Sequence, residues 1–119
     1  MFVRRNNSAK QLASNPEFRY RVGVVIPLLA PNEVGLPSNE EMESLNQIED
    51  ELSLWLEKDQ ASIQVLSITT DGMREFVFYT RTPRMIENAI NNVRSKFTLH
   101  EIQFYIKEDK KWFVYRQFT

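Results

Sequence analysis

The sequence of 119 residues contains no cysteine, one histidine and only three glycines. The absence of cysteine excludes disulfides, thiolate nucleophiles and cysteine-bound zinc or iron–sulfur centres. The one histidine, His100, has no second histidine or serine elbow with which to form a metal site or a triad, so we interpret it as a structural or surface residue. The glycines at 23, 35 and 72 are too scattered to form a phosphate-binding loop. We therefore predict no cofactor, no metal and no catalytic residue.

Long hydrophobic runs are also absent. The longest run, residues 22–30, has about half the roughly 20 residues that a membrane helix needs, and it contains Pro27. The first residues carry charge but no apolar segment typical of a secretory signal. We expect a cytoplasmic protein with no membrane contact.

Charges of both signs are present but unevenly distributed, although the net charge is −1. Residues 31–60 hold nine acids and one lysine, which gives this stretch a charge of −8. Such a stretch should not touch a phosphate backbone, but it suits either water or a basic partner. Nucleic acid is therefore not an expected partner. The one route to it would be the basic N-terminal segment with Arg4, Arg5 and Lys10, whose affinity would fall steeply with salt.

The hydrophobic pattern divides the chain into a flexible N-terminal tail, residues 1–16, and a single domain, residues 17–119. Within the domain, the clearest element is a helix over residues 39–58, which Ser38 and Glu41 begin as a capping box. The remaining elements are strands at residues 18–28, 62–70, 73–80 and 98–107, a second helix at 83–97, and a short strand or helix at 112–118.

This order of elements predicts an α+β fold of the ferredoxin-like βαββαβ type. Four antiparallel strands would form one sheet, both helices would cover one face of it, and a C-terminal extension would follow.

Asp71 and Gly72 predict a two-residue type I′ turn between the second and third strands. Pairing outward from this turn places Val65 opposite Phe78, and the face with Val65, Phe76 and Phe78 is then the one expected under the helices. The opposite face would carry Leu66, Ile68, Val77, Tyr79 and Tyr105. Such an apolar face needs a cover, which could be residues 112–118, a second copy of the chain or a foreign partner. The C-terminal segment is the simplest of the three.

Three stretches resemble the bacterial domain of unknown function family 695. They are Gly35-Leu36-Pro37, residues 71–79 (DGMREFVFY) and residues 109–115 (DKKWFVY). That family is in turn similar in its elements to the regulator of ribonuclease E activity B family, whose small, acidic, ferredoxin-like members bind an RNA-degrading enzyme. The resemblance implies a regulatory binding protein.

Six residues within these stretches are binding candidates: Arg74, Glu75, Tyr79, Asp109, Trp112 and Tyr115. One interpretation is structural, with an Arg–Glu pair beside the turn and a C-terminal Trp and Tyr that cover the second sheet face. The other is a small-molecule or enzymatic recess near Arg74, Glu75, Tyr79 and Trp112, which requires these side chains to converge on one open pocket.

The leading functional hypothesis is a non-catalytic protein-binding or regulatory module, with a protein partner or a second copy of the chain as its ligand. Besides the six candidates above, its contact surface could be the acidic face of the first helix, represented by Glu43, Asp50 and Glu57.

Overall fold

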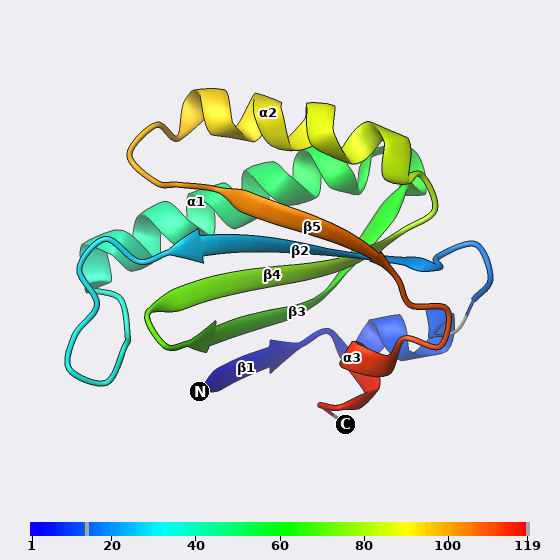
Figure 1. Ribbon diagram of the computed structural model, residues 1–119, viewed down its shortest axis with the longest axis horizontal. Helices are drawn as coiled ribbons and strands as arrows, with labels where there is room; N and C mark the ends of the chain where they lie inside the picture. Colours follow the sequence, from blue (N-terminus) through cyan, green and yellow to red (C-terminus); the bar gives the residue numbers. More distant parts are fainter. Residues whose placement is uncertain (14, 119) are drawn as a thin grey trace.

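The computed structural model describes residues 1–13 and 15–118, so Ser14 of the predicted tail and Thr119 of the predicted domain lie outside the described residues. The described residues form an antiparallel sheet of five strands in the order β1-β3-β4-β2-β5 (Figure 1). The strands are β1 (Phe2–Arg5), β2 (Tyr20–Pro27), β3 (Ser62–Thr70), β4 (Met73–Thr80) and β5 (Gln103–Glu108). The α-helices are α1 (Asn39–Leu56), α2 (Ile86–Lys96) and α3 (Phe113–Arg116), and the short 3₁₀ helices are η1 (Asn7–Leu12), η2 (Lys58–Gln60) and η3 (Pro83–Met85).

The mixed α+β class and the antiparallel sheet are confirmed, but the prediction of four strands is wrong. The additional strand, β1, pairs with β3 from Phe2 opposite Thr69 to Arg5 opposite Leu66. The sequence pattern indicated no element before residue 17, whereas the structure has β1 and η1 there. Four residues at a sheet edge show too little alternation to be recognised, because their strand depends on pairing with β3 rather than on local preference.

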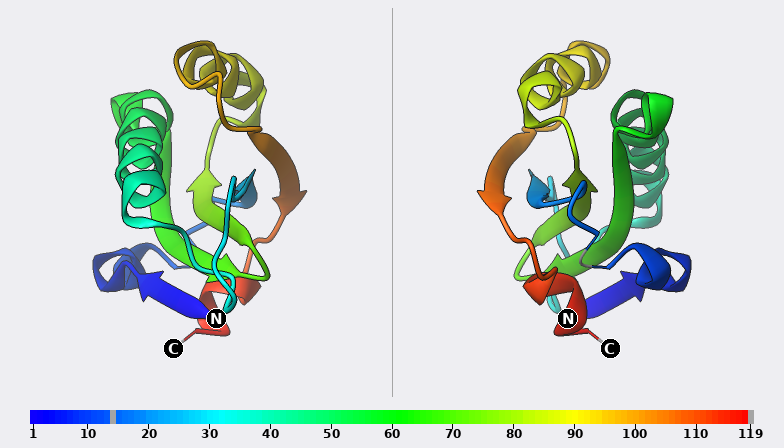
Figure 2. Two further views of the ribbon diagram at one scale, coloured as in Figure 1. Left: turned by 90° about the vertical axis from the view of Figure 1, so that its left-hand side faces the viewer. Right: turned by 90° about the vertical axis from the view of Figure 1, so that its right-hand side faces the viewer.

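The main hydrophobic core lies between the sheet and the two long helices. Phe76 and Phe78 of β4 are fully buried against apolar side chains of α1 and α2. Figure 2 shows these two helices on one side of the curved sheet and α3 on the other. The buried helical residues of this core are Leu45, Ile48, Leu52 and Leu56 from α1 and Ile86, Ala89, Ile90 and Val93 from α2.

The N-terminus of α1 is capped by only half of the predicted capping box. The Ser38 Oγ accepts the Glu41 N–H at 3.1 Å, as expected. The Glu41 carboxylate, however, accepts the Leu29 N–H at 2.7 Å and lies 2.9 Å from His100 Nε2. Both side chains are buried, so His100 links the loop before β5 to the start of α1 and is the structural one of the two expected alternatives, not a surface residue.

The Asp71-Gly72 hairpin is confirmed, because the two residues have φ angles of 51° and 75°. The predicted register holds from Thr70 opposite Met73 to Leu66 opposite Val77. A β-bulge then shifts the pairing by one residue, so that Gln64 and not Val65 lies opposite Phe78. Val65 consequently joins Leu66 in the cluster on the second sheet face, and its predicted place under the helices is wrong.

The second sheet face is covered by the C-terminal segment, the simplest of the three expected covers. Trp112 and Tyr115 are buried there together with Phe18 and with Ala9 of η1. The indole of Trp112 stacks on Tyr79 with ring centroids 4.2 Å apart. The contribution of η1 was not expected, because the sequence pattern placed it in a tail.

Gly23 in the middle of β2 makes room for the ring of Tyr105 on this second face. A Cβ atom at position 23 would lie 2.2 Å from two ring carbons of Tyr105. Because the ring cannot stay in place, we expect Gly23→Ala to lower the free energy of unfolding by about 1–3 kcal/mol, measured by urea denaturation. The loss of unfolding free energy caused by Gly23→Ala should be smaller in a chain that also carries Tyr105→Ala. An equal loss with and without the Tyr105 ring would show that the ring contact is not the cause.

Candidate functional site

Four of the six binding candidates meet in one buried cluster on the second sheet face. Asp109 accepts hydrogen bonds from the Tyr79 hydroxyl at 2.7 Å, from Arg21 Nη1 at 2.9 Å and from the Phe113 N–H at 2.8 Å. Burial alone would raise the pKa of Asp109, but these hydrogen bonds outweigh it and lower the pKa below the ordinary value. Trp112 lies between Tyr79 and Tyr115, stacked on the first and edge-on to the second.

Of the other two candidates, Glu75 is linked to this cluster through Tyr105 and Arg21, whereas Arg74 lies apart from it. As neighbours in β4 they point to opposite faces of the sheet. Glu75 accepts a hydrogen bond from the Tyr105 hydroxyl on the second face, where burial and this bond raise the pKa of Tyr105 to about 12. Arg74 lies on the helix side. Arg74 and Glu75 do not pair with each other, so their interpretation as an Arg–Glu pair beside the turn is wrong.

The recess expected near Arg74, Glu75, Tyr79 and Trp112 therefore lacks its required geometry. Arg74 is on the wrong face, and the side chains of Tyr79 and Trp112 are fully buried against each other. These four side chains do not converge on one open pocket.

The acidic face of α1 is only partly a free surface. Glu43 and Asp50 are exposed, as expected, but the carboxylate of Glu57 accepts the Gln64 N–H at 3.0 Å. Two further acids, Glu41 and Glu49, are buried. They lie four residues before Leu45 and four residues after it, on the same helix face, but the acids of this helix were expected to be solvated, so the burial of these two was missed.

Two cavities lie between α1 and the edge of the sheet formed by β1 and β3. We call the region that contains them the α1–β1 groove. The first cavity, the Arg74 recess, has a volume of about 320 Å³, and the second, the Gln64 recess, about 340 Å³. The Arg74 recess is lined by Phe2, Leu36, Pro37, Asn39, Met42, Thr69 and Arg74, and the Gln64 recess by Arg4, Arg5, Asn6, Glu57, Gln64, Val65 and Leu66.

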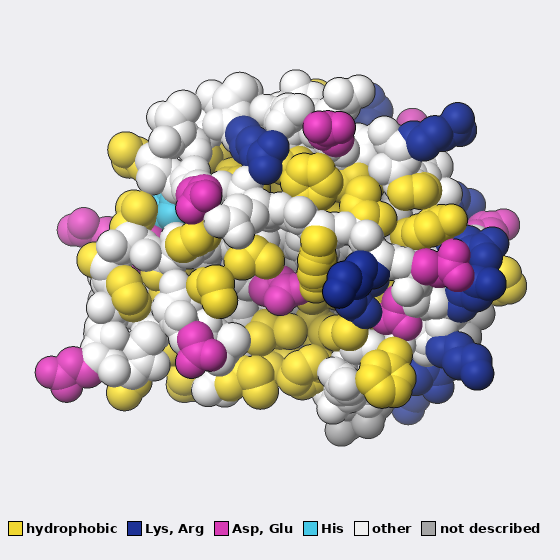
Figure 3. Space-filling view, in the orientation of Figure 1, with side chains coloured by type: hydrophobic (Ala, Val, Ile, Leu, Met, Phe, Trp, Pro, Cys, Tyr) yellow, Lys and Arg dark blue, Asp and Glu magenta, His cyan; other side chains and the backbone are white. Residues whose placement is uncertain are grey.

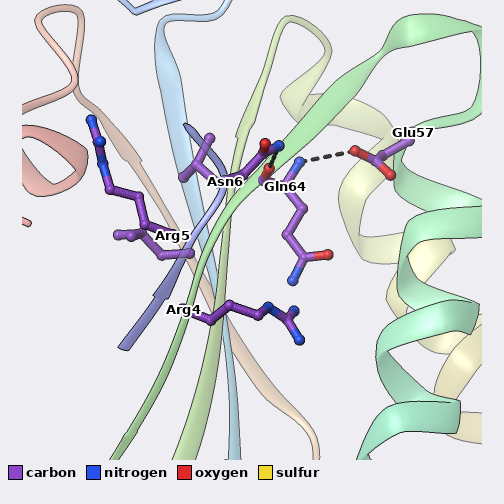
Figure 4. Close-up of a pocket in the computed structure, with 7 residues that line it drawn as sticks. Arg4, Arg5, Asn6, Glu57 and Gln64 are labelled. Carbon is purple, nitrogen blue, oxygen red and sulfur yellow. Dashed lines mark hydrogen bonds between the residues drawn. The ribbon is translucent and has the colours of Figure 1, made fainter. Parts of the chain in front are cut away.

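In the Gln64 recess several polar groups are paired with one another, although Arg5 Nε is buried without a hydrogen-bond partner among the described residues. Figure 4 shows Arg4 and Arg5 leaving β1 in opposite directions, with Arg4 pointing toward α1. Arg4 forms an ion pair with Glu49, which also accepts a hydrogen bond from Gln64 Nε2 at 2.6 Å. The Asn6 side chain donates to the Gln64 carbonyl at 2.9 Å. These contacts hold β1, β3 and α1 together.

In the Arg74 recess, by contrast, a cation is left without a counter-ion. Arg74 is only 5% exposed. Its Nε donates to Thr69 Oγ1 at 2.6 Å, and its Nη2 lies 3.2 Å from Met42 Sδ, which is a weak acceptor. Within residues 1–13 and 15–118, Nη1 has no hydrogen-bond partner and no carboxylate forms a salt bridge with the guanidinium. Burial lowers the pKa of Arg74 below its ordinary value.

Two arginines of other cavities have a carboxylate partner, whereas Arg5 of the Gln64 recess, like Arg74, has none among the described residues. Arg4 in the Gln64 recess is paired with Glu49. Arg81, which lines a third cavity of about 350 Å³, is paired with Glu17 at 2.8 Å. A ligand in the Arg74 recess could supply an acceptor to the free Nη1 of this nearly buried guanidinium.

Two of the three stretches that carry the family resemblance meet at the Arg74 recess. Leu36 and Pro37 line it from the loop before α1, and Arg74 lines it from β4. The backbones of the two stretches are close, since a Cβ atom on Gly35 would lie 3.3 Å from the Gly72 nitrogen. Sequence reasoning named Arg74 but missed Phe2, whose strand was not predicted.

The comparison with known proteins identifies a family. The whole chain, residues 1–119, matches the model of a family described as Family of unknown function (DUF695). No curated protein and no solved structure matches. Across residues 1–13 and 15–118, no helix is long and apolar enough to cross a membrane, and no three His, Asp or Glu side chains are grouped to hold a metal ion.

Proposed function

Since the chain belongs to the Family of unknown function (DUF695), we propose a function from the site itself: the protein is a non-catalytic binding domain whose binding site is the α1–β1 groove. The observation that carries this proposal is the guanidinium of Arg74, buried beside an open cavity without a carboxylate partner. A ligand with an acceptor group would supply that partner, and the new hydrogen bonds to the guanidinium would favour binding in the recess.

The order of the strands supports an explanation of how the groove arises. We interpret β2 to β5 with α1 and α2 as a ferredoxin-like unit, in line with the order β3-β4-β2-β5 and with both helices on one face. Two helices cover four strands, and β1 extends the sheet beyond them. The helix-side residues of β1, Phe2 and Arg4, are therefore left exposed, with the two recesses beside them.

We propose that the protein acts in the cytoplasm by binding a protein partner and regulating it. The likeness in element order to the regulator of ribonuclease E activity B family, which acts by binding and not by catalysis, supports it as an analogy of fold. Figure 3 shows exposed hydrophobic side chains among charged ones on one face of the molecule.

Affinity capture with tagged variants tests which surface binds. We expect Phe2→Asp to remove at least 90% of a captured partner, because the new carboxylate lies beside Arg74 and can pair with it. The double variant Glu43→Lys, Asp50→Lys on the acidic face should retain the partner, and so should Phe113→Asp, which is as exposed as position 2 but lies in α3. Loss with the acidic-face variant and retention with Phe2→Asp would place the contact on α1 and overturn the proposal.

A further inference from the structure

We propose that the Arg74 recess binds an organic monocarboxylate, with the carboxylate on the Arg74 guanidinium and a short apolar group in the cavity beside it. The inference rests on the proposed function and names the chemical class of its ligand.

The free hydrogen-bond donors of Arg74 match a carboxylate. The Nε side of the guanidinium is committed to Thr69, which leaves Nη1 and the weakly engaged Nη2 at the end of the side chain. Two nitrogens side by side present parallel N–H groups to the two oxygens of one carboxylate, the bidentate geometry that is among the strongest in proteins. Thr69 also fixes the orientation of the group, so the guanidinium does not have to be ordered by the ligand.

The charge around the recess favours a single negative charge. Arg74 is the only cation among the residues that line it. The next arginine, Arg4, is paired with Glu49, and both Glu49 and Glu41 are near enough to influence the charge of Arg74. Arg4 also influences Arg74, so the two arginines and the two glutamates balance one another, and a ligand with one negative charge meets less repulsion here than a phosphate dianion.

The remaining lining determines what else the ligand carries. Phe2, Leu36, Pro37 and Met42 give the recess an apolar wall next to the guanidinium. The volume of about 320 Å³ is near the lower end of the roughly 300–1,000 Å³ of small-molecule sites. It accommodates a short aliphatic chain of the size of a leucine side chain. Such a ligand could be a free acid or the C-terminal residue of a partner protein, since both present the same carboxylate and apolar group.

Titration of the full ¹⁵N-labelled chain, followed by NMR, tests the inference with defined probes. We expect 4-methylpentanoate to produce saturable shifts at Phe2, Leu36, Asn39, Met42 and Arg74. 4-Methylpentan-1-ol, acetate and inorganic phosphate should bind at least tenfold more weakly, because each lacks either the carboxylate or the apolar group or carries the wrong charge. Equal binding of the alcohol or of phosphate, or no saturable shift with the acid, would overturn the inference.

Variants connect the binding to the guanidinium. Arg74→Gln should weaken binding of 4-methylpentanoate at least tenfold, whereas Arg84→Gln, at an exposed arginine of η3, should leave it unchanged. If Arg74→Gln does not fold, Phe2→Asp serves instead, since it alters an exposed edge residue and should weaken binding to a similar extent. Unchanged binding in a folded variant of either kind would contradict the proposed site.

Two further probes separate the sources of the carboxylate. N-acetyl-leucine, bound at least as tightly as 4-methylpentanoate while its amide is not, would identify a protein C-terminus as the ligand. Binding of the free acid alone would identify a small metabolite. If no carboxylate binds but Phe2→Asp still loses its partner in affinity capture, the inference fails and the proposed function stands.

Discussion

Replacing Trp112 with alanine is expected to lower the free energy of unfolding by about 3–5 kcal/mol, the largest effect of any single substitution that we predict. The indole is fully buried, stacks on Tyr79 and donates its Nε1–H to the Phe18 carbonyl at 2.7 Å. Its removal would open a cavity between α3, β4 and the start of β2. Urea denaturation followed by far-UV circular dichroism measures the change.

The neighbouring residue provides a matched control. Phe113 is also a large aromatic residue but is 65% exposed, so Phe113→Ala should change the free energy of unfolding by about 0.5 kcal/mol or less. Similar losses for the two variants would show that the C-terminal segment does not cover the second sheet face in solution.

Replacing Asp109 with asparagine is expected to lower the free energy of unfolding by about 1.5–3 kcal/mol at neutral pH. The carboxylate joins three elements, because it accepts from Tyr79 in β4, from Arg21 in β2 and from the first N–H groups of α3. Asparagine cannot satisfy all of these donors and leaves Arg21 without its counter-ion. The adjacent and exposed Glu108 gives the control, since Glu108→Gln should cost less than about 1 kcal/mol.

The effect of Asp109 should also depend on pH. Its pKa in the folded protein lies below the ordinary value of an aspartate, so the ionised form is favoured by folding. The contribution to stability is therefore present above about pH 4 and is lost as the pH falls through the folded pKa. The difference between wild type and Asp109→Asn should shrink between about pH 5 and pH 2. A difference that grows on acidification would contradict the assigned role.

The parts of the fold that the sequence predicted are those with a local physical cause. The bounds of β3 and β4 agree with the predicted strands, because Asp71-Gly72 admits few other turns. The helix α1 begins at its predicted residue because Ser38 can cap it. The cover of the second sheet face by residues 112–118 was expected from the apolar side chains that needed a partner there.

The parts that the sequence did not predict depend on contacts between distant segments. Strand β1 exists because β3 has a free edge, and nothing in its four residues indicates that edge. The bulge at Val65 arises where two apolar residues, Val65 and Leu66, follow each other and both become buried on the second face. Alternation between the two faces gives no reason to place the irregularity at this position.

The candidate site also combines residues that the local sequence could indicate with residues that only contacts between distant segments bring together. Arg74 could be named from the sequence, and strand alternation already placed it on the other face from Glu75. The remaining lining could not be assembled, because Phe2, Met42 and Thr69 come from three elements that are distant in the sequence and meet only in the folded chain. The missing counter-ion of Arg74 is likewise visible only once every nearby carboxylate has been placed.

Site-specific photocrosslinking in the native cell tests the central claim, that the α1–β1 groove is the binding surface, most directly. A benzoylphenylalanine at position 2 lies at the Arg74 recess, and the same residue at position 113 lies on α3; the native phenylalanines are 62% and 65% exposed. We predict a discrete crosslinked partner from position 2 and none from position 113. A partner obtained from position 113 but not from position 2 would contradict the assignment of the groove as the binding site.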